Sequence, residues 1–273
     1  MSAFNYQDKT IFYQLDGTKG PILVMLNGIM MSVKSWEPFK DALTAHMRVL
    51  RFDFLDQGQS SKMTEPYTQA IQVDVLKALL DHLKLSSVML MGISYGASVA
   101  LQFAIKYQAY VSRLMIFNGV AKTSPWLKAI SDGWNEVAKT RQGLAYYHIT
   151  IPFIYSPRFY VEQQAWMEQR KKLLVDVFSD SVFLDAMIRL TQSAEKHDVL
   201  DRLHTINTPT LVVASEDDYL TPPFEQTLIA KHIPNAQYVL FPETGHASMY
   251  EKPSLFLTTI LGFCLDTPQN FTI

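Results

Sequence analysis

Short apolar runs of strand length recur along the chain, and longer segments with helical patterns lie between them. The predicted strands span residues 11–15, 22–26, 48–54, 87–91, 113–117, 210–214 and 237–241. The predicted helices span residues 35–46, 68–83, 94–107, 223–233 and 253–265. Near-continuous aliphatic and β-branched runs suit strands that are buried on both faces. The pattern therefore predicts an α/β fold in which helices flank a mostly parallel sheet.

This alternation is interrupted once, between Asn118 and about Arg202, where helical patterns occur without a convincing strand. Residues 161–178 and 181–203 are predicted to form amphipathic helices, with a group of aromatic residues upstream of them. We interpret the interruption as an inserted helical cap at residues 119–202, on a core formed by residues 1–118 and 203–273. Most of the aromatic residues are expected to form the core of the cap, while Trp126 is a candidate for contact with substrate.

Composition and charge exclude several classes of protein. Apolar residues make up 48% of the chain and charged residues 18%, with a formal net charge of -2 and no block rich in lysine or arginine. We therefore expect a globular protein that does not bind nucleic acid. The N-terminal residues lack an apolar signal segment, and no run reaches the roughly 18 apolar residues of a membrane span. The protein is expected to be cytoplasmic, with no membrane partner. The sequence is compatible with a monomer and with a homo-oligomer.

The single cysteine, Cys264, lies in the apolar run LTTILGFCL. A chain with one cysteine cannot form an internal disulfide. A buried thiol in apolar surroundings is unreactive, so we expect Cys264 to be a small core residue.

The strongest local motif is Gly92-Ile93-Ser94-Tyr95-Gly96, which follows a predicted strand and precedes a predicted helix. This is the G-x-S-x-G pattern of a nucleophile elbow. A sharp strand-to-helix turn lifts the serine hydroxyl clear of the sheet, and the cramped backbone requires glycine two residues to either side. The motif makes Ser94 the candidate nucleophile.

A serine hydroxyl needs a histidine base, and that base needs a carboxylate to orient it. Three acids, Glu216, Asp217 and Asp218, follow the strand at 210–214, and Gly245-His246 follows the next strand. The carboxyl ends of neighbouring strands in an α/β sheet converge on one crevice, so these distant residues can meet. His82, His197, His204 and His232 fall in helical patterns or beside turns and are interpreted as surface residues.

These motifs resemble those of the α/β-hydrolase superfamily over nearly the whole chain. The run Glu216-Asp217-Asp218 to Pro222 resembles a family segment in which Asp218 corresponds to the acid of the triad. The segment from Gly245-His246 to Phe256 resembles the family's histidine loop, and Asp53 to Ser60 resembles a structural loop. The resemblance implies an α/β-hydrolase fold with a helical cap and a triad of Ser94, His246 and Asp218.

Acyl transfer also requires hydrogen-bond donors for the oxyanion, and backbone N–H groups usually supply them. Tyr95 follows the nucleophile directly and provides the first candidate donor. The loop after the strand at 22–26 reads Asn27-Gly28-Ile29-Met30, and Ile29 is the second candidate. Where family members commonly have His-Gly, this chain has Asn-Gly. Gly28 and Met30 are further candidates for contact with substrate.

The sequence thus predicts a serine hydrolase that cleaves an ester or thioester of a small, largely apolar acyl substrate. Neither a metal nor another cofactor is implied, because the sequence has no His, Cys, Asp or Glu cluster with the spacing of metal ligands and no glycine-rich phosphate-binding loop. Three alternatives use the same fold: an acyltransferase, a hydrolase of carbon–carbon bonds, and a non-catalytic protein that binds a ligand.

Overall fold

An eight-stranded sheet forms the centre of the protein, with strand order β1-β2-β4-β3-β5-β6-β7-β8. The computed structural model describes residues 2–265. The strands are β1 (Ser2–Tyr6), β2 (Lys9–Asp16), β3 (Ile22–Leu26), β4 (Arg48–Phe52), β5 (Val88–Ile93), β6 (Val111–Phe117), β7 (Thr210–Ser215) and β8 (Ala236–Phe241). β1 and β2 are antiparallel to their neighbours, and the strands from β4 to β8 run parallel. The prediction of a mostly parallel sheet is confirmed.

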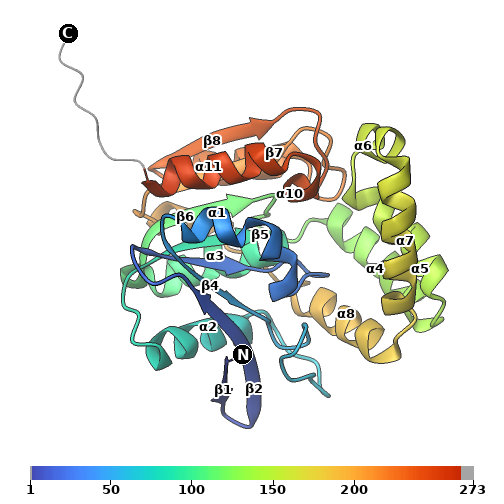
Figure 1. Ribbon diagram of the computed structural model, residues 1–273, viewed down its shortest axis with the longest axis horizontal. Coiled ribbons are helices and arrows are strands. Elements are labelled where there is room, and N and C mark those ends of the chain that lie inside the picture. Colours follow the sequence, from blue (N-terminus) through green and yellow to red (C-terminus); the bar gives the residue numbers. More distant parts are fainter. Residues whose placement is uncertain (1, 266–273) are drawn as a thin grey trace.

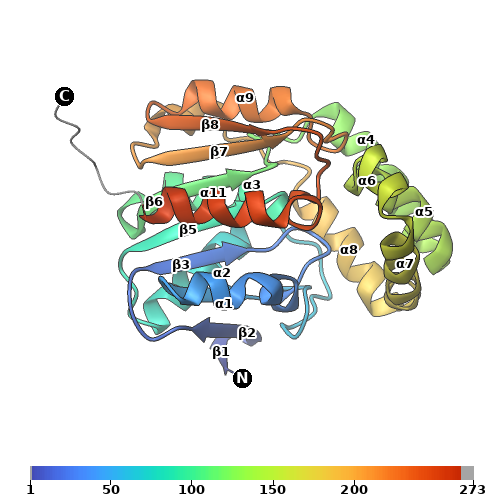
Figure 2. The same cartoon turned by 45° about the horizontal axis from the view of Figure 1, so that its top comes forward.

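Helices cover both faces of this sheet (Figures 1 and 2). They are α1 (Lys40–Thr44), α2 (Ala70–His82), α3 (Tyr95–Lys106), α9 (Pro223–His232), α10 (Ser248–Glu251) and α11 (Pro253–Leu265). One core cluster joins the sheet to α2, α3 and α9, and the other joins it to α1 and α11. Every residue of β3, β5 and β7 is buried, which explains why these strands read as unbroken apolar runs.

Two details of the sheet differ from the prediction. Strand β1 was not expected, because only Phe4 is buried in this short edge strand and no apolar run marks it. Gln7 takes a positive φ of 55° in the tight turn that leads into β2, at a position where Asn or Gly would be the usual signal. The predicted helix at 35–46 is instead a 3-10 helix (Val33–Phe39) that contains Pro38, followed by the short α1.

Between β6 and β7 the chain forms a group of helices that stands at the carboxyl end of the parallel strands (Figure 2). These are α4 (Pro125–Lys139), α5 (Gly143–Ile154), α6 (Pro157–Glu162), α7 (Gln164–Phe178) and α8 (Ser181–Ser193). We call this group the cap. The helical interpretation of the stretch is confirmed, although the predicted helix at 161–178 is divided at Gln163 and the one at 181–203 ends at Ser193. The limits 119–202 stay a prediction.

The interpretation of His197 as a surface residue is wrong. Its side chain is buried, and its ring nitrogens lie 3.1 Å from Gln102 Nε2 and 3.0 Å from the carbonyl oxygen of Val120. The segment around His197 turns back after α8 and pairs with residues 121–123, which closes the base of the cap. Burial lowers the pKa of His197, so the ring is neutral near pH 7. His82, His204 and His232 are exposed as expected.

Two other expectations concern the burial of Cys264 and the length of the apolar helices. Cys264 is buried, and burial raises the pKa of its thiol to about 12, as expected for an unreactive core residue. Among residues 2–265, no helix combines the length and the apolar character needed to cross a membrane.

A buried ion pair fastens the cap to the core. Arg189 on α8 donates through Nε and Nη2 to the two carboxylate oxygens of Asp56, at 3.0 and 2.7 Å. Asp56 has a positive φ of 73° and a fully buried side chain, which also accepts the backbone N–H of Met63. Paired hydrogen bonds of this kind fix the relative position of the two groups as well as attracting them.

Replacing Arg189 with Met is expected to destabilise the protein by about 3 kcal/mol, because the Asp56 carboxylate would stay buried without its partner. The double variant Asp56→Asn with Arg189→Met should recover much of that loss. Arg141→Met, which removes an exposed pair with Asp185 in the same cap, should cost less than about 1 kcal/mol. Urea denaturation measures the free energy of unfolding of all three variants. Equal losses for Arg189→Met and Arg141→Met would contradict the role of the Arg189–Asp56 pair in holding the cap to the core.

Candidate active site

Ser94 stands on a strained turn between β5 and α3. Its backbone lies at φ 55° and ψ -118°, a conformation that side-chain-bearing residues rarely adopt and that costs on the order of 1–3 kcal/mol. The N–H of Ser94 donates to the carbonyl of Phe117 at 2.9 Å, which ties the turn to the end of β6. The side chain is therefore presented beyond the carboxyl end of the sheet.

The glycines on either side of Ser94 are required by close packing of the backbone. A Cβ atom on Gly92 would lie 2.3 Å from the carbonyl oxygen of Gly96, and one on Gly96 would lie 2.5 Å from that of Leu26. Neither distance is compatible with a side chain. The motif identified in the sequence is thus explained by the packing of β3, β5 and α3 around the turn.

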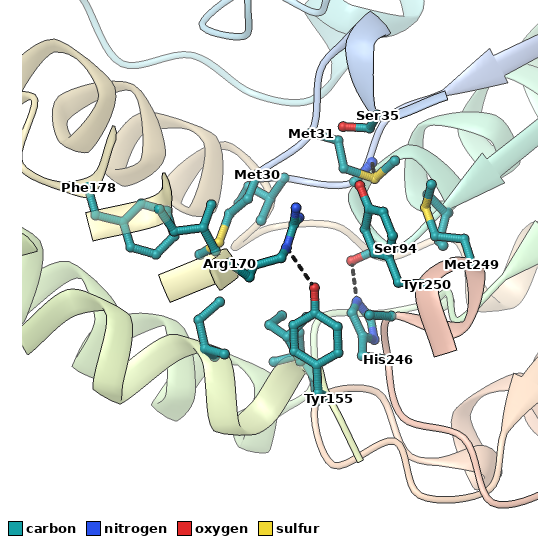
Figure 3. A pocket seen from close by; sticks show the side chains of 18 residues that line it. Met30, Met31, Ser35, Ser94, Tyr155, Arg170, Phe178, His246, Met249 and Tyr250 are labelled. Carbon is teal, nitrogen blue, oxygen red and sulfur yellow. Dashed lines mark hydrogen bonds between the residues drawn. The ribbon is translucent and has the colours of Figure 1, made fainter. Parts of the chain in front are cut away.

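His246 lies in the loop after β8 and contacts Ser94. Its Nε2 is 2.8 Å from Ser94 Oγ (Figure 3). Its Nδ1 is 2.7 Å from Asp218 Oδ2. A carboxylate can only accept, so Nδ1 carries the proton and Nε2 accepts the hydroxyl proton of Ser94. The structure brings the three predicted residues into one hydrogen-bonded chain.

The histidine loop is itself held against the cap. Glu251 on α10 accepts the backbone N–H of Gly245 at 3.1 Å and also the backbone N–H and the hydroxyl of Ser156 in the cap. The N–H of Ala247 donates to the carbonyl of Ile154 at 2.9 Å. The position of His246 therefore depends on contacts with the cap as well as with the sheet.

Of the three adjacent acids, only Asp218 is buried, whereas Glu216 is exposed and Asp217 is partly exposed. The Asp218 carboxylate accepts five hydrogen bonds, from His246, the side chains of Asn118 and Thr221, and the backbone N–H groups of Leu220 and Thr221. So many donors fix the carboxylate in one orientation.

Asn118 is a positioning residue that the sequence reasoning did not find. It follows β6 with a positive φ of 48°, and its Nδ2 donates to Asp218 Oδ2 at 2.7 Å and to Ser215 Oγ at 2.9 Å. The signal available in the sequence was its place directly after a central strand. Asn118 instead holds the carboxylate supplied by the loop after β7.

The backbone amides of Ile29 and Tyr95 lie beside Ser94. Tyr95 is the first residue of α3, so its N–H has no partner within the helix. Gln57 Nε2 and the N–H of Met31 both donate to the Gly28 carbonyl, at 2.8 and 3.2 Å. In a trans peptide the N–H points opposite to the carbonyl, so these bonds turn the Ile29 N–H away from Gln57. Within residues 2–265, neither amide has a hydrogen-bond partner.

Asn27 explains how the Asn-Gly turn is built in place of His-Gly. Its fully buried side chain donates to the Phe52 carbonyl and to Gln57 Oε1, each at 3.0 Å, and accepts the indole N–H of Trp36 at 2.7 Å. These contacts are structural. Through Gln57, they set the peptide that carries the Ile29 N–H.

Two cavities meet at Ser94, with volumes of about 100 and 70 Å³. The first, which we call the outer cavity, is lined by residues that include Gly28, Met30, Met31, Tyr155, Arg170, Phe178, His246, Met249 and Tyr250. The second, the inner cavity, is lined by residues that include Gln69, Tyr95, Ser98, Val120, Leu127, Trp134 and Thr191. Ile29, Ser94 and Leu220 line both. A carbonyl carbon beside Ser94 could thus extend in two directions.

The predicted contact residues are placed unequally. Gly28, Ile29 and Met30 line the outer cavity, and Tyr95 lines the inner one. Trp126 lines neither cavity, and the structure does not support its predicted contact with substrate. Its side chain is 50% exposed, and its indole N–H donates to the carbonyl of Tyr219 at 2.8 Å. As the second residue of α4, it lies on the outside of the cap.

The charged residue of the outer cavity was also missed. Arg170 lies on α7, within a segment that the sequence marked only as an amphipathic helix. Tyr155, one of the cap aromatics, is buried beside it and accepts its Nε–H at 3.0 Å (Figure 3). No local motif distinguishes this arginine from those that face solvent.

Comparison with known proteins agrees with this architecture. A family model described as alpha/beta hydrolase fold matches residues 21–253. The crystal structure of MGS-M2, an alpha/beta hydrolase enzyme from a Medee basin deep-sea metagenome library, is 57% identical with a TM-score of 0.97, covering 100% of both chains. The similarity therefore extends over the sheet and the cap.

More distant relatives have named activities. The putative carbamate hydrolase RutD of Azorhizobium caulinodans is 26% identical over 262 residues, which are 96% of this chain and 97% of that protein. The 3-oxoadipate enol-lactonase 1 of Acinetobacter baylyi is 27% identical over 263 residues, which are 95% and 94% of the two chains. Both relatives match over nearly their full length.

The contrast between Asp218 and Asp217 gives a test that needs no substrate. The proton on His246 Nδ1, held in a short bond to a carboxylate, should give a resonance well downfield of the amide region in the proton NMR spectrum. Asp218→Asn is expected to abolish that resonance, and Asp217→Asn to leave it in place. Loss of the signal in Asp217→Asn, with the signal kept in Asp218→Asn, would contradict the assignment of Asp218 as the partner of His246.

Proposed function

Because the chain belongs to the alpha/beta hydrolase fold family, we propose that it is a serine hydrolase that cleaves a carboxylic ester or thioester through an acyl-enzyme on Ser94. The observation that carries this proposal is the chain of hydrogen bonds from Asp218 through His246 to Ser94, at 2.7 and 2.8 Å. It ends at the point where two cavities meet. This is the arrangement that activates a serine hydroxyl.

In the first half-reaction, Ser94 Oγ attacks the carbonyl carbon as its proton passes to His246 Nε2. The N–H groups of Ile29 and Tyr95 receive the oxyanion, and Asp218 stabilises the imidazolium. The tetrahedral intermediate then collapses as the bond to the leaving group breaks and His246 Nε2 gives its proton to the leaving oxygen or sulfur. An acyl group remains bound to Ser94.

In the second half-reaction, water replaces the leaving group beside His246. It gives a proton to Nε2 while its oxygen attacks the acyl carbon, and collapse of the second intermediate returns that proton to Ser94 Oγ. The free acid is released. Cleavage of a carbonyl–heteroatom bond in this way is consistent with relatives named as an enol-lactonase and a carbamate hydrolase. The modest size of the cavities favours small, carboxylesterase-type substrates.

Turnover of short-chain p-nitrophenyl esters tests the proposal. Ser94→Ala is expected to reduce kcat by about 10⁴-fold or more, because the nucleophile is removed while the cavities remain. Ser254→Ala, on the exposed surface of α11, should behave as the wild type. Thermal unfolding of both variants checks that the fold is retained. Activity of Ser94→Ala within about tenfold of the wild type would refute the proposal.

Product analysis separates hydrolysis from the other reactions of this fold. With an alcohol or amine acceptor added at millimolar concentration, the free acid should remain the main product. Predominant transfer to the acceptor would identify an acyltransferase. Fast cleavage of a vinylogous diketone beside slow ester turnover would identify a hydrolase of carbon–carbon bonds, and a wild type that is as inactive as Ser94→Ala would identify a binding protein.

A further inference from the structure

The outer cavity contains one permanent charge in a mostly apolar lining. Most of its lining residues are aliphatic, aromatic or methionine side chains, and Arg170 alone among them is charged at every pH near neutrality. Figure 3 shows Arg170, Tyr155, Ser94 and His246 directed into the same cavity. An arginine in such a lining must have either a structural or a ligand-binding reason.

Arg170 is held in place by aromatic groups. Its Nε donates to the Tyr155 hydroxyl at 3.0 Å, and its guanidinium carbon lies 4.7 Å from the ring centre of Tyr250 and 5.4 Å from that of Trp166. These contacts stabilise the cation without neutralising it. They also restrict the rotamers of a long side chain, so the guanidinium is oriented before any ligand binds.

No carboxylate of residues 2–265 lies within ion-pair distance of Arg170. This differs from Arg51 and Arg189, each of which pairs with an acid. A partly desolvated charge without a counterion is costly, so such groups are usually paired. The terminal nitrogens of Arg170 provide the planar fork that binds a carboxylate through two hydrogen bonds.

Tyr155 provides a further donor at the same place. Its hydroxyl oxygen accepts from Arg170, which leaves its own proton free to donate to a ligand. Burial raises the pKa of this hydroxyl, so it stays protonated throughout the neutral range. Arg170 and Tyr155 together can therefore surround one carboxylate group.

We propose that Arg170 and Tyr155 form an anion subsite and that the preferred substrate is an ester or lactone with a free carboxylate at the end of the group in the outer cavity. This inference rests on the proposed function of Ser94. The alkyl or aryl part between the two ends would contact the apolar lining, and the carboxylate would supply the counterion that Arg170 lacks. A substrate with a single remote charge also fits the apolar character of the remaining walls.

Paired sets of esters test this subsite. The first set contains the monoethyl esters of succinic, glutaric, adipic and suberic acids, whose carboxylate is on the acyl side. The second contains acetate esters of ω-hydroxy acids, whose carboxylate is on the alcohol side. Each is compared with the primary amide of the same length, by following acid release in a pH-stat. We expect the wild type to prefer the carboxylate over the amide in one set, by about 10- to 100-fold in kcat/KM.

The variants locate this preference at Arg170. Arg170→Met is expected to lower the ratio of kcat/KM for the acid over that for the amide to about one, because a hydrogen-bonded charge pair is lost only for the anion. Arg170→Lys should keep part of the preference, since it retains the charge without the fork. Tyr155→Phe should reduce it as well. Lys172→Met removes one charge from the exposed face of the same helix and should change nothing.

The contrary outcomes are distinct. Two results would overturn the subsite and make Arg170 a structural contact between α7 and Tyr250. One is equal hydrolysis of the acids and the amides by the wild type. The other is an equal loss of kcat/KM for the acids and for the amides in Arg170→Met. Either result leaves the proposed function intact. Ester hydrolysis that persists in Ser94→Ala would instead overturn the proposed function itself.

Discussion

The turn at Ser94 is the constraint on which the rest of the site depends. Its positive φ and the close approach of Gly92 and Gly96 are possible only where β5 is packed between β3 and β6 and α3 begins at once. Among the described residues 2–265, the same geometry leaves the N–H of Tyr95 without a partner at the start of α3. Burial on both sides of the sheet thus maintains a local strain that places a hydroxyl and an amide donor together at the carboxyl end of the strands.

Contacts between the core and the cap extend this organisation to the binding surfaces. Arg189 secures α8 to Asp56, and Glu251 joins the histidine loop to Ser156 of the cap. The cap also provides Arg170, the group that we expect to select the substrate. The same segment thus supports the histidine loop through Ile154 and Ser156 and forms walls of the outer cavity.

The sequence predicted well those features that depend on local pattern. Fully buried parallel strands read as apolar runs, and the turn at Ser94 requires glycines that can be recognised directly, so the fold and the placement of Ser94, Asp218 and His246 were within reach. Features that depend on tertiary contact could not be predicted from local pattern. Asn118 has no local signature as a partner of Asp218, and nothing near Arg170 in the sequence reveals that α7 turns it toward Ser94. For Trp126, by contrast, the sequence suggested a contact with substrate that the structure does not support, because an aromatic residue in the cap can equally well lie on its surface.

The most direct test of the central claim is peptide mapping after reaction with a fluorophosphonate. This reagent phosphonylates a serine only when a neighbouring base activates the hydroxyl, so its site of attachment identifies the nucleophile without knowledge of the natural substrate. The account predicts one adduct, on the peptide that contains Ser94, formed by the folded protein and abolished by prior heat denaturation. An unlabelled folded protein, or an adduct on another residue with Ser94 unmodified, would contradict it.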